Sequence, residues 1–153
     1  MPDLSKLDWP VANPFVLPRT AVAEDIDEFG HVNNLRYAVW ALDVAWAHSA
    51  ELGFTVEDYH RIGVGCVVWR HEFDYLSAVL EGDEMAVATW IKENDGRVRL
   101  TRAYEMRRAT DGALCFRGET RFVTIDMKSG RPARMPPTFV EAYRPAQQRT
   151  EDE

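Results

Sequence analysis

Residues 25–52 read DIDEFGHVNNLRYAVWALDVAWAHSAEL, a short polar motif followed by a long segment with helical spacing of apolar residues. We predict a helix over Asn34–Leu52, with Asn33 or Asn34 as the N-cap and Gly53 as the left-handed residue that ends it. Only a narrow stripe of the helix needs contact with water, and it runs through Arg36, Asp43 and Glu51. A helix with so much apolar surface is usually enclosed, so we expect the rest of the chain to wrap around it.

Strand-like segments flank this helix on both sides. We predict strands over Phe15–Ala23, Ile62–Tyr75, Glu84–Asn94, Arg97–Arg108 and Ala113–Asp126. We expect one helical turn at Thr55–Arg61 and a short helix at Thr138–Tyr143. The pairs Asp95-Gly96 and Asp111-Gly112 are typical of hairpins, which predicts an antiparallel meander.

The predicted strand Arg97–Arg108 contains one interruption of its apolar pattern. Val98, Leu100, Tyr104 and Met106 share one parity, and Arg102 falls among them.

Length and composition predict one domain. The chain has 153 residues, of which 46% are hydrophobic, and this is enough to bury a core of ordinary size. We assign residues 1–153 to a single domain, with residues 1–12 and 145–153 as flexible ends. The sequence shows no secretory signal pattern and no apolar segment of membrane-spanning length, so we expect a cytoplasmic protein. Cys66 and Cys115 lack metal-ligand spacing and are expected to be buried thiols.

Charge is distributed unevenly along the chain. The net charge of −7 argues against general affinity for nucleic acid. Residues 1–96 hold six Lys and Arg against seventeen Asp and Glu, whereas residues 97–153 hold twelve against eight. The second part could therefore contact a ligand that carries phosphate. We expect most of the arginines on the strands of this part to lie on solvated strand faces, and one or two of them to contact an anion. These arginines are Arg97, Arg99, Arg102, Arg107, Arg108, Arg117 and Arg121.

The polar motif before the helix carries groups suited to catalysis. Asp27 precedes His31 by four residues, and the first N–H groups of the helix lack intrahelical partners. A base, a polar orienting group and a dipole that polarises a carbonyl could meet here.

Each of these residues also has a structural interpretation. Asp27 could close a turn, and the ring of His31 could bind a backbone carbonyl. Either Asn33 or Asn34 caps the helix, which leaves the other to orient Asp27, water or a partner subunit. Gly30 meets a backbone requirement, and we expect Asp25 to be solvated or part of a turn.

Metal binding is not predicted. Asp25, Asp27 and Gly30 resemble the opening of a helix-loop-helix calcium loop, but Phe29 and Arg36 then occupy ligand positions. The four histidines show no close ligand spacing on one helix. We predict no metal and no cofactor.

The motif resembles a known family, the hot-dog-fold acyl-CoA thioesterases. Asp27 with Gly30 and the following helix resembles the 4-hydroxybenzoyl-CoA thioesterase pattern. The run from His31 to Asn34, with Arg36-Tyr37, is more similar to the long-chain acyl-CoA and plant acyl-carrier-protein branches, although Phe29 stands where the latter has Asn. The resemblance continues through Phe73-x-Tyr75 and Gly82-Asp83-Glu84-Met85 and covers about residues 13–127.

This resemblance implies an α+β hot-dog fold, in which a five-stranded antiparallel sheet wraps around one long central helix. It implies hydrolysis of an acyl-CoA or related acyl thioester, with Asp27 as base or nucleophile. The catalytic assignments that follow are Asp27, His31 and Asn34. We assign substrate contacts to Gly30, Val32 and Asn33. A homodimer, or a tetramer of two such dimers, is implied as well.

Two other functions use the same fold. A non-catalytic protein that binds or senses acyl thioesters would bind its ligand in the same pocket but would show no turnover that depends on Asp27. A hydratase or dehydratase is disfavoured because those enzymes resemble a pattern with a His first on the helix, whereas here the carboxylate precedes the helix.

Overall fold

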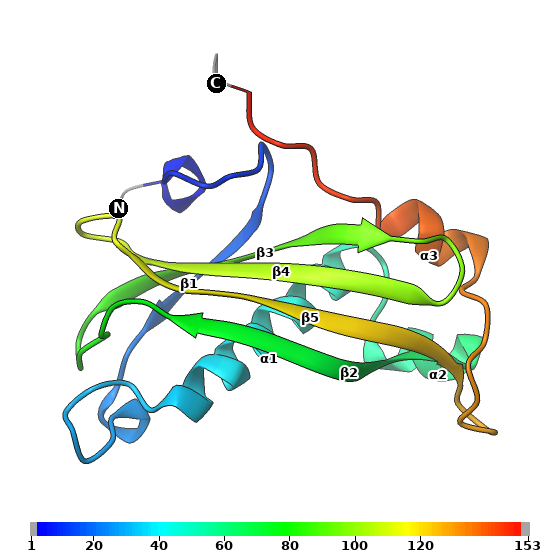
Figure 1. The fold of residues 1–153 in the computed structure, drawn as a ribbon, viewed down its shortest axis with the longest axis horizontal. Coiled ribbons are helices and arrows are strands. Elements are labelled where there is room, and N and C mark those ends of the chain that lie inside the picture. The colour runs from blue at the N-terminus through cyan, green and yellow to red at the C-terminus, as the bar shows by residue number, and fades with distance from the viewer. Residues whose placement is uncertain (1–2, 151–153) are drawn as a thin grey trace.

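A computed structural model describes residues 3–150 of the chain. Five antiparallel strands form one sheet in the order β1-β3-β4-β5-β2, and the long helix α1 crosses one face of it (Figure 1). The strands are β1 (Phe15–Thr20), β2 (Val64–Tyr75), β3 (Glu84–Asn94), β4 (Arg99–Arg108) and β5 (Leu114–Asp126). The helices are α1 (Asn34–Glu51), α2 (Val56–Ile62) and α3 (Pro137–Ala142), with 3₁₀ turns at Leu4–Lys6 and Ala23–Asp25. This is the predicted hot-dog architecture.

The element boundaries differ from the predicted ones where side chains cap the backbone. β4 begins at Arg99 and not at Arg97, because the Asp95 carboxylate accepts the N–H groups of Arg97, Val98 and Arg99. The expected single turn at Thr55–Arg61 is a two-turn helix, since Thr55 and Asp58 form a capping box. Gly63, at φ 82°, ends that helix, so β2 starts at Val64.

The prediction of a simple meander is correct only for β3, β4 and β5. The two Asp-Gly turns join these strands as expected. β2, however, pairs with β5 at one edge, and β1 pairs with β3 at the other. Residues 76–83 therefore cross between the two edges, and the Gly82 N–H donates to the Ala21 carbonyl beside β1 at 2.8 Å.

The main core lies between α1 and the sheet. Tyr37, Trp40 and Val44 point inward and are at most 4% exposed. The Tyr37 ring stacks on Phe116 of β5 with a centroid separation of 5.3 Å. α1 packs closest to β3 and β1, so it covers the β2 side of the sheet less completely.

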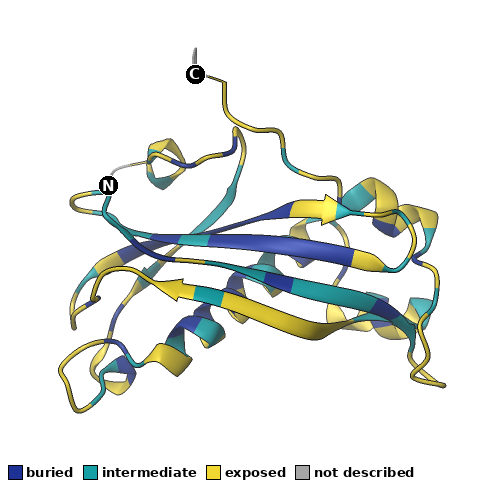
Figure 2. Cartoon of the chain, in the orientation of Figure 1, coloured by how far each residue is buried: buried dark blue, intermediate teal, exposed yellow. Residues whose placement is uncertain are grey.

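The predicted enclosure of α1 is wrong for the single chain. Leu35 is 69% exposed, and Val39, Leu42 and Trp46 on the same helix are also exposed. β2 is exposed along most of its length (Figure 2). An apolar helix face and an open strand edge are therefore left for another surface to cover.

The flexible ends expected at residues 1–12 and 145–153 do not fit the part of them that is described. Trp9 and Val11 are buried against Ala86 and Ala88 on the face of the sheet opposite α1. Val11 also forms a β-bridge with Gln148, so the chain segments around these two residues lie side by side (Figure 1). Burial of these apolar side chains orders the segment. Residues 1–2 and 151–153 lie outside the described residues.

Candidate functional site

The predicted catalytic residues lie on a tight loop that leads into α1. Ile26 and Val32 form an isolated β-bridge, and the Asp27 N–H donates to the His31 carbonyl at 2.8 Å. Gly30 closes the loop at φ 81°, where an added Cβ would meet no atom within 4 Å. Gly30 is therefore required by the backbone conformation and not by packing.

The Asp27 side chain is half-buried and takes part in this turn. Its Oδ1 accepts the N–H groups of Phe29 at 2.9 Å and His31 at 3.4 Å. Among residues 3–150, no hydrogen bond reaches Oδ2. The turn role is thus present, and one carboxylate oxygen is left for another partner.

Asp25 anchors the loop and is not the solvated residue that we expected. It is 2% exposed, and its Oδ1 accepts a 2.7 Å bond from the Arg36 guanidinium on α1. Its Oδ2 accepts the Val22 N–H at 3.0 Å, and its carbonyl accepts the Asn33 N–H at 2.8 Å. The prediction failed because the partner of Asp25 lies eleven residues away on the helix.

The start of α1 provides backbone donors beside the loop. Asn33 is the N-cap, and its side chain accepts the Leu35 N–H at 2.9 Å. Asn34 is the first helical residue and is exposed, and its N–H has no hydrogen-bond partner within the described chain. The Tyr75 hydroxyl donates to the Asn34 carbonyl at 3.4 Å, which brings the end of β2 to this point. A free N–H at a helix N-terminus favours negative charge on oxygen.

The other two predicted site residues have different surroundings. His31 is exposed, and its ring makes no hydrogen bond within residues 3–150, so the carbonyl-bound structural role is not observed. The Val32 side chain is 4% exposed and packs in the core, which is at odds with the predicted substrate contact. Its N–H donates to the Val79 carbonyl at 2.9 Å and holds the loop against residues 76–83.

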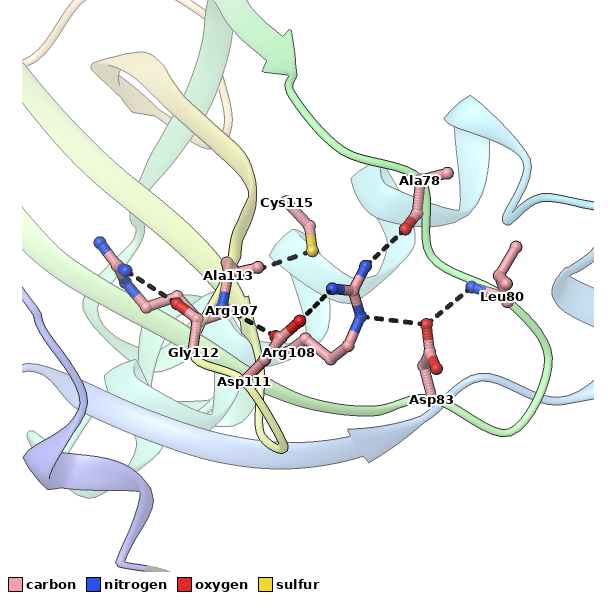
Figure 3. A network of polar contacts seen from close by, with 9 residues as sticks. All are labelled: Ala78, Leu80, Asp83, Arg107, Arg108, Asp111, Gly112, Ala113 and Cys115. Atoms are coloured by element: carbon pink, nitrogen blue, oxygen red, sulfur yellow. Dashed lines mark hydrogen bonds and ion pairs between the residues drawn. The ribbon is translucent and has the colours of Figure 1, made fainter.

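Residues 76–83 are in turn fixed by the Arg108 guanidinium (Figure 3). Arg108 donates to the Ala78 carbonyl at 2.8 Å, to Asp111 at 2.8 Å and to Asp83 at 3.3 Å. Asp83 also accepts the Leu80 N–H at 2.9 Å. The network links the β4–β5 turn to the segment that supports the Asp27 loop.

A cavity of about 570 Å³ lies between α1 and the sheet, starting about one helical turn beyond Asn34. Most of its lining is apolar and comes from one side of α1 and from β2, β4 and β5. Trp46 of α1 and Val68 of β2 are among its lining residues. A mostly apolar cavity with few polar groups is typical of a small-molecule site.

Sequence reasoning missed the polar groups inside this cavity. Arg102 is 3% exposed and lines it, although we had favoured a solvated strand face for most arginines of this segment. It donates to His48 Nδ1 at 2.8 Å and to Ser49 Oγ at 3.4 Å. The signal in the sequence was the interrupted alternation of β4, because a strand residue on the core-facing parity must point inward.

His48 is neutral at neutral pH. Burial, and then the neighbouring Arg102 charge, lower the pKa of His48 to about 4. Since a guanidinium only donates, Nδ1 accepts and the ring proton sits on Nε2.

Within residues 3–150, no cluster of three His, Cys, Asp or Glu side chains is placed to hold a metal ion. No helix there is long and apolar enough to span a membrane.

Comparison with known proteins gives the family of this chain. The thioesterase-like superfamily matches residues 21–143, and the chain belongs to this family. The fold is similar to that of a 1,4-dihydroxy-2-naphthoyl-CoA thioesterase from Synechocystis, with 18% identity, a TM-score of 0.77 and coverage of 86% of this chain and 96% of that one. No curated protein sequence matches.

Two Staphylococcus aureus structures are also similar. A hypothetical protein solved in complex with CoA gives 21% identity and a TM-score of 0.80, covering 91% of this chain and 90% of the other. A DHNA-CoA thioesterase gives 23% identity and a TM-score of 0.77, covering 85% and 88%. At these identities the similarity establishes the hot-dog fold, and the family match establishes the thioesterase-like class.

Proposed function

We propose that this protein hydrolyses an acyl-CoA, or a related acyl thioester, to a free carboxylic acid and a thiol. The observation that carries the proposal is the Asp27 loop, which holds a carboxylate with an open Oδ2 just before a helix whose first N–H is free. Membership of the thioesterase-like superfamily supports the same reaction class.

The chemistry requires few groups because a thioester carbonyl is already electrophilic. The Asn34 N–H and the α1 dipole would stabilise negative charge on the carbonyl oxygen. Asp27 would accept a proton from water as the water oxygen bonds to the carbonyl carbon, and the C–S bond then breaks to release the thiolate, which takes up a proton. In the nucleophilic alternative, an Asp27 carboxylate oxygen bonds to the carbonyl carbon and the C–S bond breaks, which releases the thiolate and leaves an acyl anhydride on Asp27. Water then hydrolyses the anhydride to the free acid and the regenerated Asp27 carboxylate.

His31 and the substrate-binding residues complete the proposed site. The exposed His31 ring could bind a polar group of the substrate near Asp27. Gly30 would shape the entrance to the site through the conformation of the loop, and Asn33 through the helix cap. Val32 would hold the loop in position through the bond from its N–H to the Val79 carbonyl.

A homodimer is part of the proposal. The open edge of β2 exposes Val67, Val68 and Trp69. On α1, Leu42 and Trp46 are exposed beside the cavity. A second copy would cover these apolar surfaces and close the cavity, and sedimentation equilibrium tests this directly.

The enzymatic test measures thiol release from short, medium, long and aromatic acyl-CoAs. The variants are Asp27→Ala and, as a matched control, Glu28→Ala, the exposed neighbour on the same loop. Both are first compared with wild type by circular dichroism and thermal unfolding. We expect turnover by wild type and Glu28→Ala, and its loss in Asp27→Ala.

Two other outcomes would contradict the proposal. Binding of acyl-CoA without turnover in any form of the protein would favour a sensing protein, in which Asp27 only closes the turn observed at Phe29 and His31. Formation or loss of a double bond without thiol release would favour a hydratase or dehydratase.

A further inference from the structure

The cavity contains a buried cation without an anionic partner. Arg102 forms none of the ion pairs found among residues 3–150, and its partners are neutral: His48 and Ser49 on α1, and Thr89 on β3. Burying a guanidinium without a carboxylate is costly, and that cost is already included in the folded state. An anion that enters the cavity would therefore pair with Arg102 without a further cost for desolvating the guanidinium.

The groups around Arg102 do not supply the missing charge. The Ser49 hydroxyl accepts from the Tyr143 hydroxyl at 3.0 Å, and Tyr143 is hydrogen-bonded to the Tyr59 hydroxyl. Burial raises the pKa of both tyrosines, and it raises the pKa of the Cys66 thiol to about 11. All three groups stay neutral near pH 7.

The end of α1 carries partial negative charge but no carboxylate that contacts Arg102. The Leu52 N–H binds the His48 carbonyl at 3.0 Å, and the Phe54 N–H binds the Ser49 carbonyl at 2.8 Å. The carbonyls of His48 and Ser49 thus bind backbone N–H groups, and Arg102 contacts these two residues through their side chains.

Arg102 belongs to a polar row across a mostly apolar sheet face. It pairs with Thr120 of β5, which pairs with His71 of β2, and the Thr120 hydroxyl lies 2.8 Å from His71 Nδ1. All three residues line the cavity. The row crosses the path that an acyl chain would follow between α1 and the sheet.

The row is far from the proposed reaction site. Tyr75, which contacts the start of α1, is about 13 Å along β2 from His71. Asn34 is about 22 Å along α1 from Ser49. A group held by Arg102 is therefore at the distal end of a long acyl chain and not at the thioester.

We propose that the cavity selects acyl thioesters whose chain ends in a carboxylate, and that Arg102 binds this terminal carboxylate. The inference rests on the proposed function, since it takes the cavity to hold the acyl group. Arg102 acts as a specificity-determining residue, and Ser49 and the row toward His71 offer further hydrogen bonds to the carboxylate.

The test uses thioethers of CoA, which bind but cannot be hydrolysed. Octyl, dodecyl and hexadecyl thioethers are each compared by titration calorimetry with the same thioether carrying a terminal carboxylate. The proteins are wild type, Arg102→Met, Arg102→Lys, and Arg99→Met as a matched control from the same strand. Arg99 is exposed and lies over the Trp69 ring, with its guanidinium carbon 5.4 Å from the ring centroid.

Wild type and Arg99→Met should bind the carboxylate form at least tenfold more tightly at one chain length or more, as a charge-assisted hydrogen bond allows. Arg102→Met should abolish this preference, and Arg102→Lys should retain part of it. Equal affinity of wild type for both forms at every length, or failure to bind any of them, would overturn the inference. The wild-type comparison decides the question even if Arg102→Met does not fold.

The thioethers separate this inference from the proposed hydrolysis. A carboxylate preference without thiol release from any acyl-CoA would remove the enzymatic proposal and retain the Arg102 site. Thiol release without a carboxylate preference would retain the enzymatic proposal and overturn the Arg102 site.

Discussion

The Asp27 loop and the Arg102 cluster are both polar, but they satisfy their polar groups in opposite ways. In the loop, Asp27 and Asp25 accept backbone N–H groups, and Asp25 also has a cationic partner. In the cluster, Arg102 is buried among neutral side chains from three other segments. The loop thus satisfies its polar groups locally and leaves one Asp27 carboxylate oxygen free, whereas the Arg102 guanidinium has no anionic partner within the described residues.

The largest stability effect should come from removing the anchor of the loop. Asp25→Ala leaves Arg36 and the Val22 N–H without their acceptor, and we expect a loss of about 2–4 kcal/mol in the free energy of unfolding. The control is Asp43→Ala, which breaks the exposed pair with Arg19 and should cost less than about 1 kcal/mol. Urea denaturation measures both. Similar costs would mean that the Asp25 pair does not hold the loop.

The Arg102 cluster should make stability depend on pH. The pKa of His48 is about 4 in the folded chain, whereas an unfolded histidine titrates near 6.5. Between these values the unfolded chain binds the extra proton, so stability falls as the pH drops from about 6.5 to 4, by roughly 1–3 kcal/mol. Urea denaturation of wild type and His48→Gln across this range isolates the effect. An identical pH dependence in both proteins would contradict the assigned neutral His48.

Gly30 tests whether the loop conformation itself matters. Gly30→Ala places a Cβ in open space but at φ 81°, so its cost of about 1–2 kcal/mol comes from the backbone alone. Thermal unfolding measures it, with Gly65→Ala, which lacks a positive φ and meets Met127 at an ordinary 3.4 Å, as the control. No difference between the two would show that the loop relaxes freely.

The smallest effect is expected at the helix cap. Asn33→Ala removes the acceptor of the Leu35 N–H and should cost about 1 kcal/mol, whereas Asn33→Asp should retain the cap. Chemical denaturation of the two variants gives the difference. A cost for Asn33→Asp as large as that for Asn33→Ala would mean that the amide N–H₂, and not the oxygen, is what the site uses.

Local patterns predicted most of the helices and strands well, whereas the hot-dog fold itself was implied by the family resemblance. Helical spacing and the Asp-Gly turns placed α1 and β3–β5 to within two residues, because these signals act over a few residues. The positions of β1 and β2 at opposite edges depend on pairings far apart in sequence, which turn signals do not encode. The buried Trp9 segment was missed for the same reason.

In the candidate site, too, the features set by neighbouring residues were predicted, and those set by distant residues were not. The Asp27 motif is contiguous, so its loop, its glycine and its cap could be predicted from neighbouring residues. Asp25 and Arg102 could not be interpreted correctly, since their environments come from partners eleven or more residues away. Only the interrupted alternation at Arg102 marked it as unusual.

Asp27 is proposed to perform chemistry in addition to closing its turn, and Asp27→Asn separates the two roles. The amide oxygen can still accept the Phe29 and His31 N–H groups, whereas the base or nucleophile is lost. The decisive measurement is the initial rate of thiol release by this variant, relative to wild type at equal folded fraction, on the best acyl-CoA. We predict a fall of about 10²–10³-fold or more, the scale of losing a principal catalytic group. A rate within twofold of wild type would contradict the claim and leave Asp27 as a turn residue.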